Sequence, residues 1–219
     1  MSNIAIVDYG MGNLYSVAKA VEHVAAAADR ISITSSPKEI AASDKIIFPG
    51  QGAAKDCMTA LIELELQTAI IDAAQQKPFL GICMGMQVLM NTSEENSGTQ
   101  CLAFYEGGVE YFGNHVSIGA SEGSVKVPHM GWNCIEQQQN HPLWKGIPES
   151  SYFYFVHSYF VRCDQQELVA GTTDYGLTFT SAIAKDNVFA MQCHPEKSAK
   201  AGLQLLSNFS QWDGNNVAN

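Results

Sequence analysis

The sequence predicts an α/β fold, with a doubly wound, mostly parallel sheet, helices on both of its faces and a smaller region of antiparallel strands. Three observations lead to this prediction. Short apolar segments alternate with amphipathic ones through the first hundred residues, as in repeated β-α-β units. From Gln100 the pattern changes to short alternating strands separated by turns. With 219 residues, 46% of them hydrophobic, the chain can bury one core, and we expect residues 1–219 to form a single domain.

In the first half, we expect four strands with helices between them. Three strands are expected at 4–7, 31–34 and 45–48, and a fourth runs into Cys83. Helices are expected at 14–28 and through 61–71, with a short one begun by Ser36 and Pro37 in the order of N-cap and first helical residue. In parallel sheets, sites lie at the carboxyl ends of the strands, which is where Cys83 and the glycines at 10–13 and 50–52 fall.

In the second half, the most distinct pattern is a hairpin. Asp186-Asn187 separates the apolar segments 181–185 and 188–192, which predicts two paired strands. The aromatic run at 152–155 predicts a strand buried on both faces, and an amphipathic helix is expected at 198–212. Residues 214–219 are expected to be a frayed tail.

Charge and cysteine content narrow the classes of partner. The net charge is −10 and the basic residues are scattered, so neither nucleic acid nor an anionic membrane is an expected partner. The six cysteines include no pair with zinc-site spacing, and we expect no metal and no cofactor. Gly10-Met11-Gly12 lacks the third glycine of a dinucleotide-binding loop, because Tyr15 stands at that position. Without a secretory leader or a long apolar segment, the chain is expected to be cytoplasmic and reduced.

The segment Gly81-Ile82-Cys83-Met84-Gly85 has the spacing of a nucleophile on a sharp strand-to-helix turn. Such a turn strains the backbone at the nucleophile and leaves little room for side chains beside it, which explains the two glycines. The helix that follows points its N-terminal amides at the sulfur and favours the thiolate. The alternative is an ordinary buried cysteine in a strand–loop–helix joint, and this motif alone does not decide between them.

A thiol nucleophile needs a base, and three histidines are candidates: His129, His157 and His194. We favour His194, because it ends an apolar strand and is followed at once by Pro195 and Glu196. Glu196 is close enough in sequence to accept a hydrogen bond from the far ring nitrogen and to fix the imidazole tautomer. Acyl transfer also needs an oxyanion hole, for which we expect backbone amides at Gly50–Gly52 and at Met84.

Three motifs together resemble the signatures of class I (triad-type) glutamine amidotransferases: 81–87, the Pro-Gly-Gln-Gly at 49–52 and the His-Pro-Glu at 194–196. Three further segments, at 8–14, 126–133 and 154–159, are similar to the glutaminase subunits of imidazole glycerol phosphate synthases. The resemblance spans nearly the whole chain, from Asp8 to Ser198. It implies a flavodoxin-like class I amidotransferase fold and a heterodimer with a synthase (cyclase) subunit.

The resemblance also implies roles for individual residues. Cys83 would attack the side-chain amide of L-glutamine, His194 would protonate the leaving ammonia and Glu196 would orient His194. Hydrolysis of the thioester would give glutamate, and the ammonia would pass to the cyclase subunit. The oxyanion hole would use Gly52 and Met84, and the glutamine-binding positions would be Gly50, Gly52, Gln87, Glu95 and Ser158. The residues facing the cyclase would be Asn13, Trp132 and Lys197. This chain departs from the family at Gln51, where many members carry Val.

Three alternatives remain at this point. A free-standing cysteine hydrolase of γ-glutamyl compounds would need neither a partner nor the block at 128–133. A non-catalytic assembly subunit would carry a vestigial triad, which the intact motifs disfavour. The glutaminase of another synthase, such as anthranilate or GMP synthase, is disfavoured by the Pro-His-Met-Gly-Trp-Asn block at 128–133.

Overall fold

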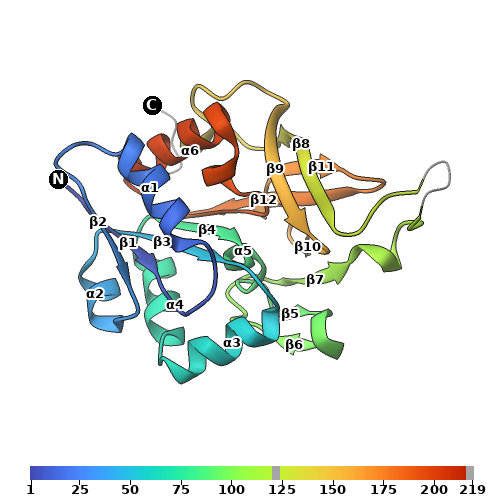
Figure 1. Cartoon of the computed structure of the whole chain (residues 1–219), viewed down its shortest axis with the longest axis horizontal. Helices are drawn as coiled ribbons and strands as arrows, with labels where there is room; N and C mark the ends of the chain where they lie inside the picture. The colour runs from blue at the N-terminus through green and yellow to red at the C-terminus, as the bar shows by residue number, and fades with distance from the viewer. Residues whose placement is uncertain (120–123, 216–219) are drawn as a thin grey trace.

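The computed structural model describes residues 1–119 and 124–215, whose strands join into one mixed sheet (Figure 1). Its parallel part runs in the order β2-β1-β3-β4-β13. Because β1 lies between β2 and β3, the chain winds first to one side and then to the other, as predicted for a doubly wound sheet. The bounds are β1 (Asn3–Val7), β2 (Arg30–Thr34), β3 (Lys45–Gly50), β4 (Phe79–Cys83) and β13 (Val188–Met191).

Alternate side chains of these strands enter two cores, one on each face of the sheet. Ile4 and Ile6 of β1 pack with the buried faces of α1 (Leu14–Val24) and α6 (Ala199–Gln211). Ala5 and Val7, one position along the same strand, pack with the helices of the opposite face. Those helices are α2 (Pro37–Ala42), α3 (Ala54–Glu63) and α4 (Gln67–Gln76), and Figure 1 shows them on the other side of the sheet from α1 and α6.

The helices α1 and α2 begin where the sequence predicts, but α1 ends earlier than expected. Ser36 caps α2 by accepting a hydrogen bond from the Glu39 amide, and Pro37 is the first helical residue. The helix expected at 14–28 ends at Val24. The expectation of one helix through 61–71 is wrong. The chain forms two helices there, α3 and α4, with a break between them at Glu65, whose φ is 55°. The break turns the chain so that Leu66 is fully buried at the start of α4.

The antiparallel part of the sheet continues from β13 through the predicted hairpin. β12 (Thr178–Lys185) pairs with β13 across Asp186, and β11 (Val169–Asp174) pairs with β12. On from β12, the sheet continues in the order β10 (Tyr159–Cys163), β7 (Gly107–Tyr111), β5 (Thr92–Ser93) and β6 (Thr99–Gln100). Short 3-10 turns connect several elements: η1 (Glu95–Ser97), η2 (Phe112–Asn114), η3 (Pro142–Trp144), η4 (Gln166–Leu168) and η5 (Pro195–Lys197).

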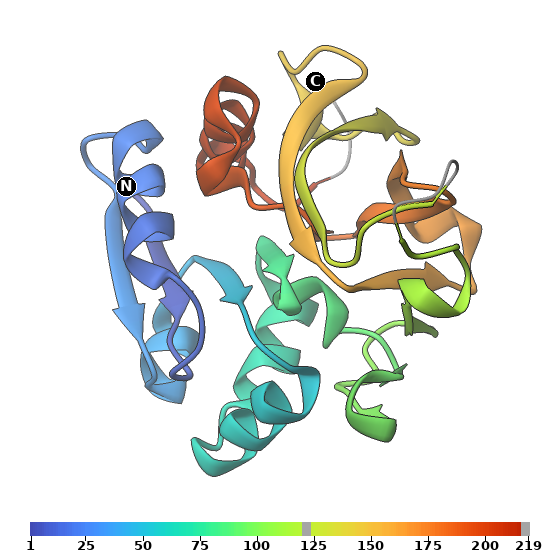
Figure 2. The same cartoon turned by 45° about the vertical axis from the view of Figure 1, so that its right-hand side comes forward.

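β8 (His129–Gln137) and β9 (Ser151–His157) form a curled pair beside α6 (Figure 2). The expectation that 152–155 is buried on both faces is wrong. Phe153 and Phe155 are buried, whereas Tyr152 is 59% exposed, because only one face of β9 covers the core. The final helix is α6, one residue shorter at each end than expected. Of the predicted tail at 214–219, residues 216–219 lie outside the described part of the chain.

No helix within the described residues is long and apolar enough to cross a membrane. The fold class expected from the sequence is confirmed: a mostly parallel sheet covered by helices on both faces and extended by antiparallel strands.

Candidate active site

Sheet register brings the predicted site residues to one edge. β3 and β4 are parallel, and Gly50 lies opposite Cys83 in their pairing. β13 lies on the other side of β4, where Met191 is opposite Ile82. The carboxyl ends of three adjacent strands therefore carry Gly50, Cys83 and the segment that leads to His194.

Cys83 sits at the turn between β4 and α5 (Met84–Gln87), with φ 55° and ψ −108°. This backbone conformation is strained for a residue with a side chain, and it is the strain expected of a nucleophile elbow. Gly85 is required by close approach, because a Cβ at this position would overlap the carbonyl oxygen of Phe48. The following helix has only four residues.

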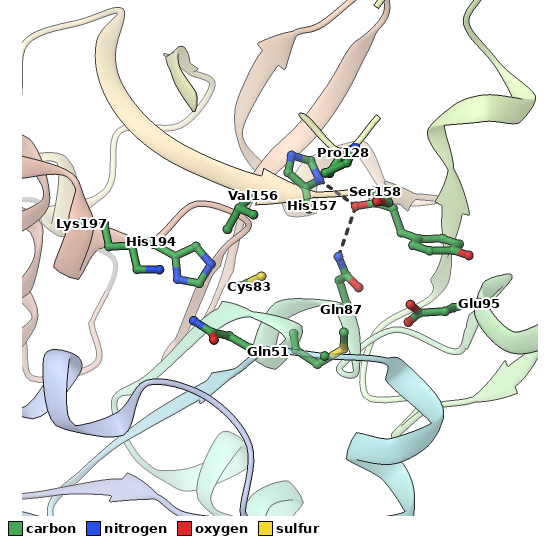
Figure 3. Close-up of a pocket in the computed structure, with 13 residues that line it drawn as sticks. Gln51, Cys83, Gln87, Glu95, Pro128, Val156, His157, Ser158, His194 and Lys197 are labelled. Atoms are coloured by element: carbon green, nitrogen blue, oxygen red, sulfur yellow. Dashed lines mark hydrogen bonds between the residues drawn. The ribbon is translucent and has the colours of Figure 1, made fainter. Parts of the chain in front are cut away.

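Cys83 lies in a cavity of about 390 Å³, a size suited to a small molecule. Figure 3 shows Cys83 with His194 on one side and Gln87 on the other, Gln51 nearby, and Glu95 at the far end. The complete lining is Gln51, Gly52, Cys83, Met84, Gln87, Glu95, Pro128, Val156, His157, Ser158, Tyr159, His194 and Lys197.

His194 and Glu196 form a buried pair. The His194 Nδ1 atom lies 2.9 Å from Glu196 Oε1, and the two side chains are only 2% and 1% exposed. The backbone of His194 is held in turn, because its amide donates to the Tyr154 carbonyl and its carbonyl accepts from Ser198 Oγ. The second ring nitrogen, Nε2, is buried and has no hydrogen-bond partner among the residues that the structure describes.

Electrostatics favour a charged imidazole at this position. Burial by itself lowers the pKa of His194, but the neighbouring Cys83 sulfur and the Glu196 carboxylate more than offset it and raise the pKa to about 10. The imidazolium is thus stabilised between a sulfur on one side and a carboxylate on the other. This arrangement can hold a thiolate–imidazolium pair and can deliver a proton to a leaving group.

The other two candidate histidines bind each other. His129 Nδ1 lies 3.0 Å from His157 Nε2, and His157 Nδ1 lies 2.7 Å from the Tyr159 carbonyl oxygen. Since a carbonyl only accepts, His157 donates from Nδ1 and accepts at Nε2 from His129. Burial lowers the pKa of His129 to about 4 and that of His157 to about 3, so both rings are neutral near pH 7. His157 lines the cavity, but its hydrogen bonds leave no ring nitrogen free for Cys83.

The glycines of the expected oxyanion segment are packed tightly. Gly50 lies behind the cavity wall, where an added Cβ would overlap the Tyr9 hydroxyl and crowd the Met84 side chain. Gly52 has φ 94° and lines the cavity together with Met84. Gln51 also lines the cavity, to which it contributes a carboxamide.

The positions expected to bind glutamine are brought together, except that Gly50 is covered. Gln87 in α5, Glu95 in η1 and Ser158 between β9 and β10 all line the cavity. Glu95 also has a structural task, because its Oε2 accepts a 2.6 Å hydrogen bond from the Ala54 amide at the start of α3. Burial raises the pKa of Glu95, and the hydrogen bond from Ala54 opposes that rise.

The positions expected to face a partner are exposed. Trp132 is 51% exposed on β8, where its ring lies 6.1 Å from that of Tyr154. Lys197 is exposed at the rim of the cavity, with its ammonium 6.0 Å from the same Tyr154 ring. Asn13 is exposed at the start of α1, where its side chain accepts from the Ser16 amide, and α1 contacts η5, the turn that contains Lys197.

Two groups that complete the site are not among the residues expected from the sequence. Gln192 donates from Nε2 to the Cys83 sulfur at 3.5 Å, and the Tyr159 carbonyl accepts from Gln87 at 3.2 Å. A signal for Gln192 was present, since it directly follows the apolar strand that ends before His194. A signal for Tyr159 was absent, because any residue has a carbonyl.

A cysteine, a histidine and a carboxylate at the carboxyl edge of a doubly wound sheet define the class of cysteine hydrolases and acyl transferases that work through a thioester. A family model described as glutamine amidotransferase class-I matches residues 5–211. The chain belongs to the class-I glutamine amidotransferase family, and within it to the group of imidazole glycerol phosphate synthase HisH subunits.

Close relatives cover nearly the whole chain. It is 54% identical over 211 residues to the imidazole glycerol phosphate synthase subunit HisH of Hydrogenovibrio crunogenus, covering 96% of this chain and 97% of that protein. The HisH subunit of Nitrosococcus oceani is 51% identical over 214 residues, with 98% and 99% covered.

Solved structures share the fold at low identity. PurLQS from Thermotoga maritima superposes with a TM-score of 0.72 at 16% identity, covering 95% of this chain and 98% of that one. The glutaminase domain of Trypanosoma brucei CTPS, solved with bound acivicin, gives 0.65 at 19% identity, with 97% and 95% covered.

Proposed function

We propose that this chain is the glutaminase subunit of an imidazole glycerol phosphate synthase, acting in histidine biosynthesis. The observation that carries the proposal is Cys83, held in a left-handed turn in the same cavity as the buried His194–Glu196 pair. The proposal is also supported by relatives about half identical over 96–98% of this chain, which are named as HisH subunits of imidazole glycerol phosphate synthases. We also propose that residues 1–219 are a single domain and that the protein works in the cytoplasm.

In the proposed reaction, the Cys83 thiolate attacks the side-chain carbonyl carbon of L-glutamine. A carbon–sulfur bond forms, and the carbonyl oxygen becomes an oxyanion next to the backbone amides of Gly52 and Met84. His194 gives its proton to the nitrogen, the carbon–nitrogen bond breaks and ammonia leaves. His194 then takes a proton from water as the water attacks the thioester, and the products are glutamate and the free thiolate.

The polarity of the cavity suits a zwitterionic amino acid. Glu95 lies at the end of the cavity away from His194, where its carboxylate can bind the α-ammonium group of glutamine (Figure 3). Gln87 and Ser158 lie between Glu95 and Cys83 and offer polar atoms along the substrate. The Glu196 carboxylate does not line the cavity and acts through His194.

We propose that the partner is the cyclase subunit of the same synthase. Beside the cavity, β8 and β9 expose large apolar side chains in an area that a partner can cover: Met130 (62%), Trp132 (51%) and Tyr152 (59%). Asn13 and Lys197 flank this area with polar groups, so the interface has an apolar centre and a polar border. Ammonia released at Cys83 would pass into the cyclase and react there, giving imidazole glycerol phosphate and aminoimidazole carboxamide ribotide.

Glutaminase activity without an acceptor would waste glutamine, so we propose that the partner activates it through the backbone at Gly50–Gly52. The test is glutamate release by the isolated chain, by the chain with the cyclase subunit, and by the complex with its nucleotide substrate. We expect a rise at each step and equal amounts of glutamate and imidazole product in the last.

Full turnover by the isolated chain, with no rise on addition of the cyclase, would contradict partner activation. High activity of the isolated chain on other γ-glutamyl compounds would instead favour a free-standing hydrolase. A non-catalytic subunit would fail to react at Cys83 with an electrophilic glutamine analogue, even in the complex.

A further inference from the structure

Gln192 is a fully buried residue placed directly against the nucleophile. The pairing of β13 with β4 puts Met191 beside Ile82, and Gln192 and Cys83 are the next residues along each strand. The Gln192 backbone amide donates to the Ser181 carbonyl at 2.8 Å, which fixes the main chain. Its side-chain Nε2 then donates to the Cys83 sulfur at 3.5 Å. The Cys83 sulfur therefore accepts a hydrogen bond from Gln192, in addition to its interaction with His194.

Gln87 fixes which way the Gln192 carboxamide points. Gln87 Nε2 donates to Gln192 Oε1 at 2.9 Å and to the Tyr159 carbonyl at 3.2 Å. If the Gln192 carboxamide were flipped, its amino group would face the amino group of Gln87 and its oxygen would face the sulfur. Both new contacts would be unfavourable, so the donor side of Gln192 faces Cys83.

The anchor of this chain of hydrogen bonds is also fixed. The Tyr159 carbonyl accepts from His157 Nδ1 as well as from Gln87, and both bonds are drawn in Figure 3. Both N–H groups of the Gln87 carboxamide are thereby engaged, and only its oxygen is left to accept a hydrogen bond from a ligand. The amino group of Gln87 is thus held by Gln192 and Tyr159, and it does not donate into the cavity.

We propose that Gln192 is a further catalytic residue of this site, which stabilises the Cys83 thiolate by a hydrogen bond, and that Gln87 is the positioning residue that orients it. The inference rests on the proposed thioester mechanism. A hydrogen bond to an ionised acceptor is stronger than one to a neutral acceptor, so Gln192 favours the thiolate over the thiol. When the thioester is hydrolysed, the carbon–sulfur bond breaks and the electron pair returns to the sulfur. Gln192 then stabilises Cys83 as the leaving group.

The test is alkylation of Cys83 by iodoacetamide as a function of pH, in the full-length chain and without glutamine. The label at Cys83 is read by mass spectrometry of its peptide, with Cys101 as the internal reference. Burial raises the pKa of Cys101 to about 11, so Cys101 reacts slowly near pH 7.

Two substitutions remove the donor in different ways. Gln192→Met keeps similar volume without a donor, and we expect alkylation at pH 7 to slow about tenfold and its midpoint to rise by about one pH unit. Gln192→Glu keeps the shape but turns a carboxylate oxygen toward the sulfur, so its shift should be larger. Gln87→Met should give a smaller shift in the same direction. Gln211→Met, an exposed glutamine on α6, is the matched control and should change nothing.

The inference is overturned if folded Gln192→Met and Gln192→Glu alkylate with the rate and midpoint of the unmodified chain. Circular dichroism and thermal unfolding establish that the variants are folded. If Gln192→Met does not fold, Gln192→Asn decides, because it keeps an amide but is one methylene too short to reach the sulfur. Absence of glutamate release by the unmodified complex would contradict the proposed function, whereas unchanged alkylation in the variants contradicts only the role of Gln192.

Discussion

Replacing Glu196 with Gln tests how much the buried carboxylate contributes to the site. Its Oε1 lies 2.9 Å from His194 Nδ1, and both side chains are almost fully shielded from water. A hydrogen bond between charged groups contributes roughly 1.5–3 kcal/mol, which is about a 10- to 150-fold change in rate. We therefore expect Glu196→Gln to lower kcat/KM for glutamate release by about 10- to 150-fold. The KM should change little, because Glu196 does not line the cavity.

The pH dependence gives this prediction a second readout. The pKa of His194 is raised from 6.5 to about 10, with burial opposing and Cys83 and Glu196 favouring the charged ring. Removing the Glu196 charge lowers that pKa, so the alkaline limb of the rate profile should move to lower pH. The assay measures glutamate release by the complex from pH 6 to 10, with exposed Glu63→Gln as the control. An unchanged rate and an unchanged alkaline limb in Glu196→Gln would refute the reasoning.

Three further predictions follow from other parts of the site. Glu95→Gln should raise the KM for glutamine and leave thermal stability unchanged. Glu95→Ala should raise the KM and also lose about 1 kcal/mol of stability, because the Ala54 amide at the start of α3 loses its acceptor. Steady-state kinetics measure the KM, and calorimetry measures the stability. The neutral His129–His157 pair has lowered pKa values, so the unfolded chain binds more protons below pH 6.5 and stability falls with acid. His129→Phe should weaken this fall between pH 6.5 and 4, as measured by denaturant unfolding; an unchanged slope would contradict the assignment. Trp132→Ala should weaken binding to the cyclase by about tenfold or more in calorimetry, with Cys83 alkylation unaffected.

Much of the fold follows from local pattern. Apolar alternation predicts the parallel strands, and the hairpin at Asp186 follows from turn chemistry. The break between α3 and α4 is not predicted, because Glu65 has no turn signature in the sequence. The break allows Leu66 to be buried, which depends on tertiary packing rather than on local pattern. The exposed face of β9 is also missed, because an aromatic run has the same composition whether one or two of its faces are covered.

The site likewise contains residues that local motifs predict and contacts that only the fold creates. Cys83, His194 and Glu196 are predictable because each lies in a short motif whose spacing matches a chemical role. The Gln87–Gln192 contact joins residues 105 positions apart in the chain, and only the register of β13 against β4 brings them together. The choice of His194 over His129 and His157 already follows from its motif, and the structure adds that the latter two bind each other.

Cys83 is the proposed nucleophile for glutamine hydrolysis. The most direct test of this role is glutamate release by the complex with the cyclase subunit, comparing the unmodified chain with Cys83→Ala and with Cys101→Ala as the control. Because no other group can replace the thioester-forming sulfur, Cys83→Ala should lose activity by about a thousandfold or more, with cyclase binding retained. Cys101→Ala should keep its activity. Wild-type glutamate release by a folded, cyclase-bound Cys83→Ala variant would contradict the account.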